Sequence, residues 1–146
     1  GSRKLIGGQV LDLEGEGKEL SKAQLVRIHE NKTAALLTTS LRLGGMTANA
    51  TPRQLDALSD FGYTLGLAFQ VIDDILDVTQ STAQLGKTAG KDEAVDKATY
   101  PSILGLNKSK KEAARLTRKA LEALTVFGRR GKRLKEIAHY LLDREF

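Results

Sequence analysis

A helical repeat of apolar residues runs through almost the whole 146-residue chain. Apolar side chains recur three and four positions apart, and no segment shows the strict alternation that is typical of a half-buried strand. This pattern restricts the fold to the all-α class. We predict helices over 3–13, 23–43, 52–79, 101–106 and 109–126, and a last helix that ends near residue 142.

Start signals precede two of these helices. Ser21 followed by Gln24 matches a capping box, in which two side chains satisfy backbone N–H groups of the first helical turn. Thr51 and Gln54 repeat the pattern around Pro52, and proline is favoured at the first helical position. Both signals predict where the chain enters a helix.

Other residues predict helix boundaries and close packing. Gly44 and Gly45 indicate the end of the 23–43 helix, and Ser109 with Glu112 indicates the start of another. Small side chains within the 52–79 helix predict close contact with a neighbouring helix; they are Gly62, Gly66 and Ala68.

Composition limits the classes of protein that fit. The length suits one domain with a sizeable core, and the absence of Cys leaves no disulfide framework, so we expect a reducing, cytoplasmic location. No stretch is apolar enough to span a membrane, and no signal-peptide pattern is present. The chain opens without Met inside an amphipathic pattern, so we expect a piece of a longer protein.

Positive charge is concentrated in residues 107–146, with twelve Lys and Arg against five Asp and Glu. Such a segment can contact nucleic acid, a membrane surface or an anionic substrate, and it can equally be the solvated face of a helix. Nucleic acid is not favoured as a partner, because Trp is absent and only 5% of residues are aromatic.

Three carboxylates interrupt the apolar run FQVIDDILDV, which covers residues 69–78. Asp73 and Asp77 lie one helical turn apart on one face, Asp74 lies on the flank, and Gln70 precedes them by one turn. Carboxylates this close repel one another unless a cation lies between them. Oxygen ligands suit Mg²⁺, which is typically shared with substrate phosphates, so we favour a metal site over an exposed acidic patch.

Cationic and polar residues occur in three other places. His29, Lys32 and Thr33 share the spacing of one helix face, although the segment HENKT also fits an ordinary polar face. Gln9 and Asp12 lie one turn apart. They could have a functional role, or they could simply form hydrogen bonds with the adjacent turn. The segment 81–99 breaks the helical period and reads as a functional loop that could bind phosphate, or as a solvated loop. The candidate residues within it are Lys87, Lys91, Asp92 and Lys97.

Together these segments resemble the C-terminal half of a trans-isoprenyl diphosphate synthase (polyprenyl synthetase) of the farnesyl/geranylgeranyl type. GGQVLDLEGEGK is similar to the GGQ-x-x-DL segment of that family, HENKT to H-x-x-K-T, and FQVIDDILD to its second aspartate-rich motif. LGKTAGKD and KATYP fit the loop that follows. The five segments occur in the family order and cover essentially the whole chain.

The resemblance implies an all-α bundle that joins isopentenyl diphosphate to an allylic diphosphate and yields a short-chain trans-prenyl diphosphate. It implies Mg²⁺, with Mn²⁺ as an alternative, held by Asp73, Asp74 and Asp77, of which Asp73 is the most direct ligand, with Asp12 beside the metals. It also assigns residues to the diphosphate and to the allylic cation. Those that hold diphosphate are Lys32, Lys87, Lys97 and Gln9, and those that stabilise the cation are Thr33 and Gln70.

The chain departs from the family in having no second Asp-Asp pair. The first aspartate-rich motif and most of the isopentenyl diphosphate site belong to the family's N-terminal half, so residues 1–146 would be the C-terminal part of the domain and inactive alone. Two alternatives stay open, namely a non-catalytic half-subunit of a heteromeric synthase and a relative of terpene cyclases. Because half of a bundle leaves apolar faces uncovered, we expect a homo-oligomer, in particular a dimer.

Overall fold

The computed structural model describes residues 2–85 and 98–142, and every regular element within them is helical. The all-α prediction is therefore confirmed. The elements in chain order are η1 (Ser2–Ile6), α1 (Gly7–Glu14), α2 (Lys22–His29), η2 (Glu30–Ala34), α3 (Ala35–Thr47), α4 (Pro52–Leu85), α5 (Tyr100–Leu104), α6 (Leu106–Ala123), η3 (Leu124–Gly131) and α7 (Lys132–Leu142).

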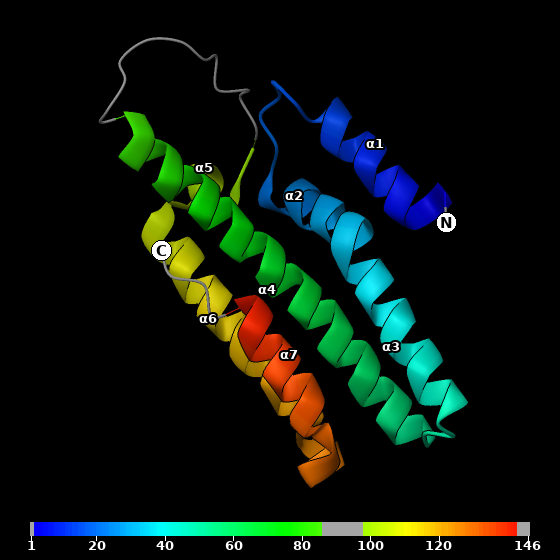
Figure 1. Cartoon of the computed structure of the whole chain (residues 1–146). Coiled ribbons are helices and arrows are strands. Elements are labelled where there is room, and N and C mark those ends of the chain that lie inside the picture. The colour runs from blue at the N-terminus through cyan, green and yellow to red at the C-terminus, as the bar shows by residue number, and fades with distance from the viewer. Residues whose placement is uncertain (1, 86–97, 143–146) are drawn as a thin grey trace.

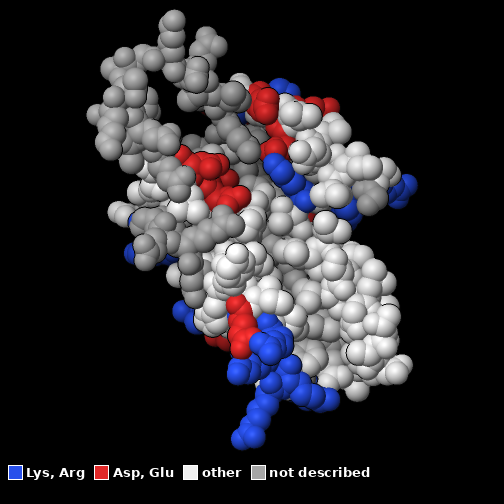
Figure 2. All heavy atoms as spheres, in the orientation of Figure 1, with Lys and Arg blue, Asp and Glu red and all other residues white. Residues whose placement is uncertain are grey.

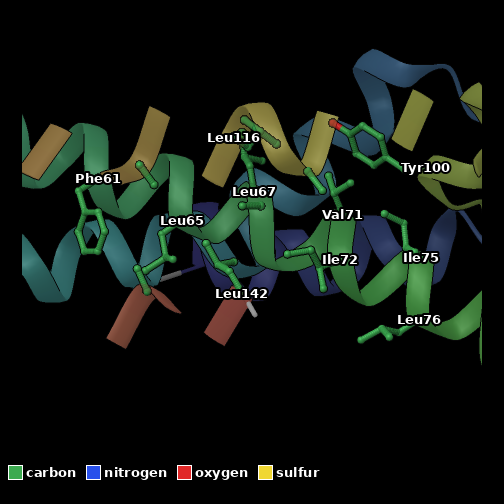
Figure 3. Packing of buried hydrophobic residues seen from close by; sticks show 14 of the residues in the cluster. Phe61, Leu65, Leu67, Val71, Ile72, Ile75, Leu76, Tyr100, Leu116 and Leu142 are labelled. Carbon is green, nitrogen blue, oxygen red and sulfur yellow. The ribbon is translucent and has the colours of Figure 1, made fainter. Parts of the chain in front are cut away.

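Helix α4 forms the centre of the molecule. With 34 residues it is about 51 Å long, and α3 lies along one side of it while α6 and α7 lie along the other (Figure 1). The core follows α4, where apolar side chains from Phe61 to Leu76 meet Leu116 of α6 and Leu142 of α7 (Figure 3). In the part of the chain that the structure describes, no helix is long and apolar enough to cross a membrane.

The predicted start signals at Ser21 and Thr51 are confirmed. The Ser21 hydroxyl accepts a hydrogen bond from the Gln24 backbone N–H, and the Gln24 side chain accepts one from the Ser21 N–H. Thr51 and Gln54 make the same reciprocal pair ahead of α4, with Pro52 as its first residue. These local hydrogen bonds satisfy first-turn N–H groups that have no partner within the helix.

Three predicted helix boundaries are wrong. Gly44 and Gly45 do not end the second long helix, because α3 continues to Thr47. Ser109 does not cap α6, which begins at Leu106; the buried Ser109 hydroxyl donates to the Gly105 carbonyl instead. Helix α4 extends beyond the predicted end near residue 79, so the first residues of the predicted loop are helical.

The small residues of α4 permit the close packing that the sequence predicts. A methyl group on Gly66 would lie 2.5 Å from Cα of Ala34, and one on Gly62 would lie 2.8 Å from Cα of Thr38. Ala68 is fully buried in the core cluster. Helix α4 therefore touches η2 and α3 almost backbone to backbone at Gly62 and Gly66.

Candidate functional site

The polar face of α4 is turned toward η2. Gly66 marks the contact with Ala34 of η2, and Asp73 follows Gly66 by seven residues, which is about two helical turns. Gln70 and Asp77 lie one turn to either side of Asp73 on the same face. The side chains of Gln70 and Asp73 are partly exposed and that of Asp77 is exposed. This face can therefore present carboxylate and amide oxygens to a ligand.

Asp74 has a different environment from its neighbour. Its side chain is buried, and its Oδ2 accepts a hydrogen bond from the Tyr100 backbone N–H at 2.9 Å. The same oxygen lies 3.7 Å from Nε2 of His29. A carboxylate held between α2 and α5 in this way is turned away from the face that carries Asp73.

The segment η2 is a single π-helical turn inside what the sequence predicts as one continuous α-helix. Such turns hold about one extra residue and are frequent at functional sites. His29, just before the turn, is buried against Asp74, whereas the Lys32 ammonium reaches Asp12 of α1 at 2.6 Å. The predicted cationic spot shared by His29 and Lys32 is therefore not formed.

Helix α1 approaches η2 through a glycine. A methyl group on Gly8 would lie 2.5 Å from the Lys32 backbone nitrogen and 2.9 Å from Cβ of Asn31. On the other side of η2, the hydroxyl of Tyr63 in α4 donates to the carboxylate of Glu30. The π-helical turn is thus held between α1 and α4, with Gly8 on one side and Gly66 on the other.

The predicted site residues fall into three groups. Asp73, Asp77 and Gln70 share one face of α4, and Asp12 pairs with Lys32 where α1 meets η2. Thr33 lies in the same turn as Lys32, and its side chain is partly exposed. The side chain of Gln9 in α1 is exposed. Lys87 and Lys97 lie outside the described residues, as do Lys91 and Asp92.

The described residues offer few donors for a metal ion. Within residues 2–85 and 98–142, no three His, Cys, Asp or Glu side chains converge as a cluster that could hold a metal ion by themselves. Asp73 and Asp77 nevertheless fit Mg²⁺, because this ion is commonly held by one or two carboxylates while water and substrate phosphates supply its other ligands. The buried Asp74 carboxylate fits such a role less well.

Charge is unevenly distributed over the face shown in Figure 2. Acidic side chains gather near α1 and the adjacent part of α4, and Lys and Arg side chains gather at the opposite end, where η3 and α7 lie. The basic residues of that end are Arg129, Arg130, Lys132, Arg133 and Lys135. The basic C-terminal segment is thus set apart from the carboxylates of α4.

Tyr100 lies in an apolar and negatively charged environment. Burial raises the pKa of its hydroxyl to about 12, with smaller contributions from the charges of Glu112 and Asp74. Hydrogen bonds from Arg115 hold the pKa of Glu112 below its usual value, and the Glu112 carboxylate also lies 3.9 Å from Lys22 Nζ. These charged groups connect α2 to α6 beside Tyr100.

Sequence reasoning assigned no role to Tyr100 and misread that of His29. The two rings stack with centroids 5.7 Å apart and planes inclined by 21°. The signal that could have found Tyr100 is the capping box of Thr99 and Ser102, which makes Tyr100 the first residue of α5. The N–H of a first-turn residue needs an acceptor outside its helix, and a carboxylate supplies one.

Comparisons with known proteins show the family to which the chain is related. The sequence profile of the family Polyprenyl synthetase matches residues 2–140. A chloroplastic geranylgeranyl pyrophosphate synthase from Catharanthus roseus is 45% identical over 147 residues, which cover 99% of this chain and 41% of the relative. The farnesyl diphosphate synthase of Escherichia coli (strain K12) is 42% identical over 144 residues, which cover 96% of this chain and 48% of the relative.

A solved structure shares the fold. The geranyltransferase from Helicobacter pylori, complexed with magnesium and isoprenyl diphosphate, matches with a TM-score of 0.72 and 34% identity over 97% of this chain and 46% of that one. The chain thus spans somewhat less than half the length of these relatives. Because the family profile covers nearly every residue, the chain belongs to the polyprenyl synthetase family.

Proposed function

We propose that this chain is part of a prenyltransferase that joins isopentenyl diphosphate to an allylic diphosphate, and that residues 1–146 form the C-terminal part of its domain. The observation that carries the proposal is the Gly66–Ala34 contact, which brings α4 and η2, each with a polar surface, almost backbone to backbone. One surface, on α4, presents Asp73 and Asp77. The other, in η2, presents Lys32 and Thr33.

Each group has a role that follows from its charge. In the reaction, the C–O bond to the diphosphate breaks, the double bond of isopentenyl diphosphate attacks the allylic cation, and a proton is lost. Mg²⁺, when bound, neutralises the developing charge of the leaving diphosphate. Asp73 and Asp77 would hold the ion, while Lys32 would bind the diphosphate as a point charge.

Neutral dipoles can stabilise the allylic cation. The amide oxygen of Gln70 and the hydroxyl of Thr33 can face the allylic carbon without adding a charge that would capture it. The Helicobacter pylori relative binds magnesium and isoprenyl diphosphate, which supports magnesium here. Use of Mn²⁺ and roles for Gln9, Lys87 and Lys97 in diphosphate binding remain predictions.

The 146 residues alone are expected to bind diphosphate but not to catalyse the reaction. The sequence holds one Asp-Asp pair, and carboxylates on one side of a diphosphate leave the other side without metal ligands. A non-catalytic half-subunit would show the same behaviour in isolation. The two readings differ when the chain is fused to the first part of the Escherichia coli relative, because the fusion enzyme should release diphosphate only if the chain is catalytic.

A binding measurement tests the proposal directly. Titration calorimetry with inorganic diphosphate should give binding that depends on Mg²⁺ and is lost in Asp73→Ala. Asp60→Ala, a change at an exposed position of the same helix, should leave it intact. The proposal fails if both variants bind like the unaltered chain. Repeating the titration with Mn²⁺ tests the alternative ion.

Exposed apolar side chains support association of the chain with a second copy. Leu13 of α1 and Leu43 of α3 are 62% and 58% exposed, and Leu36 and Met46 of α3 are also exposed. Burying such side chains removes apolar surface from water. We expect a dimer, which light scattering can measure. A cytoplasmic location stays a prediction, because the Catharanthus roseus relative is named as chloroplastic.

A further inference from the structure

Asp74 is a carboxylate in the core of the helical assembly. Its exposed fraction is 6%, and it lies among Val71, Ile75 and other fully buried side chains of α4. An ionised carboxylate in such surroundings is costly unless hydrogen bonds and charges compensate it. Its partners therefore reveal what the residue does.

Within the part of the chain that the structure describes, two other elements supply partners for Asp74. The Tyr100 N–H, at the first residue of α5, donates to Asp74 at 2.9 Å, and His29 Nε2, at the last residue of α2, lies 3.7 Å from the same oxygen. His29 and Tyr100 are themselves buried and stack on each other. We call these three side chains, with the Tyr100 N–H, the Asp74 anchor.

The anchor constrains the two polar surfaces of the candidate site. Successive residues of a helix are about 100° apart, so fixing the direction of Asp74 also fixes the direction of Asp73. His29 immediately precedes η2, so holding its ring fixes the start of the turn that carries Lys32. One buried carboxylate thus sets the orientation of both surfaces.

We propose that Asp74 is a positioning residue, not a metal ligand: it ties α2, α4 and α5 together so that Asp73 and Lys32 face a common ligand. This inference rests on the proposed function, and it departs from the expectation that all three carboxylates of the motif bind metal. Residues that orient metal ligands commonly change metal affinity by about ten- to a hundredfold when altered.

Three variants separate positioning from ligation, namely Asp74→Ala, Asp74→Asn and Asp73→Asn. The first readout, taken without metal, is hydrogen exchange of the Tyr100 amide in the 146-residue chain. Asp74→Ala removes the acceptor and should speed exchange by at least about tenfold. Asn retains an acceptor oxygen, so Asp74→Asn should keep most of the protection, and Asp73→Asn should keep all of it.

The second readout is binding of inorganic diphosphate in the presence of Mg²⁺. Asp74→Ala should weaken it by about ten- to a hundredfold, whereas Asp74→Asn should restore it to within a few fold of the unaltered chain. Asp73→Asn should lose the magnesium dependence. If Asp74→Ala does not fold, the comparison of Asp74→Asn with Asp73→Asn still decides the question.

Two results would overturn the positioning role. One is unchanged protection of the Tyr100 amide in Asp74→Ala. The other is an Asp74→Asn variant that keeps that protection but loses magnesium-dependent binding as completely as Asp73→Asn does, because Asp74 would then act as a ligand. If no variant alters diphosphate binding, the proposed function fails, and amide exchange still tests the anchor.

Discussion

Gly8 of α1 and Lys32 of η2 are in backbone contact: a methyl group on Gly8 would lie 2.5 Å from the Lys32 nitrogen. This separation is shorter than any ordinary contact with a β-carbon, and the opposing atoms belong to the backbone or to Asn31, so they cannot move aside. The contact brings α1 close enough for Asp12 to reach Lys32. A glycine thus sets the spacing of two predicted site residues.

Gly8→Ala should therefore lower the free energy of unfolding by about 1–3 kcal/mol, since overpacking forces the helices apart. Urea denaturation measures the change. Gly44→Ala is the matched control, because Gly44 lies within α3 with nothing within 4 Å of the added methyl group. It should raise stability by about 0.5–1 kcal/mol through helix propensity. Equal effects of the two variants would contradict the contact.

The Asp12–Lys32 pair should contribute measurably to stability. Its side chains are only 17% and 26% exposed and its atoms are 2.6 Å apart, so solvent screens it less than a surface pair. A double-mutant cycle of Asp12→Asn and Lys32→Met should give a coupling energy of about 1 kcal/mol. The same cycle on Arg118 and Glu122, which are 71% and 65% exposed, should give a value near zero. Equal coupling energies for the two pairs would show that partial burial does not strengthen the Asp12–Lys32 interaction.

Gln70→Leu should slow formation of the allylic cation and leave binding of the diphosphate unchanged. Leu fills a similar volume without the amide dipole, so the fusion enzyme should lose kcat while calorimetric binding of Mg²⁺ with diphosphate is retained. A loss of roughly tenfold or more in kcat is expected if one dipole that faces the cation is removed. Equal loss of binding and of kcat would instead place Gln70 on the diphosphate.

Local signals in the sequence predicted the helices well where hydrogen bonds between near neighbours determine the structure. Ser21 with Gln24 and Thr51 with Gln54 form the predicted capping boxes. Such boxes need only residues three apart, so the sequence contains all the information. The polar face of Asp73 and Asp77 was predictable for the same reason, because it follows from helical spacing alone.

Tertiary contacts account for what the sequence did not predict. Gly45 resembles a helix-ending glycine, yet it lies inside α3, where the lack of a side chain makes room for α4: a methyl group there would come within 2.5 Å of Leu58. The π-helical turn η2 shifts Lys32 relative to His29, and no local sequence pattern predicts this turn. Asp73 and Asp74 look equivalent in sequence, and the positions of α2 and α5 distinguish them, because His29 and the Tyr100 N–H both lie against Asp74.

The pKa of Tyr100 makes stability depend on pH in the alkaline range. Burial raises this pKa to about 12 in the folded protein, against 10.0 for an ordinary tyrosine. Between pH 10 and 12, the unfolded chain therefore loses the proton while the folded chain keeps it. Stability conferred by the protonated hydroxyl is fully present below pH 10 and falls as the pH rises through this window.

The loss should approach about 1.4 kcal/mol per pH unit, and on the order of 2–3 kcal/mol by pH 12. Urea denaturation at intervals from pH 9 to pH 11.5 measures it, and Tyr100→Phe removes the titrating group while keeping the buried ring. The difference between the two proteins isolates Tyr100 from other groups that titrate in this range. Tyr140→Phe is the control, because Tyr140 is 85% exposed and its removal should leave the profile unchanged. Identical profiles for the unaltered chain and Tyr100→Phe would show that the Tyr100 hydroxyl is accessible to solvent in the folded protein.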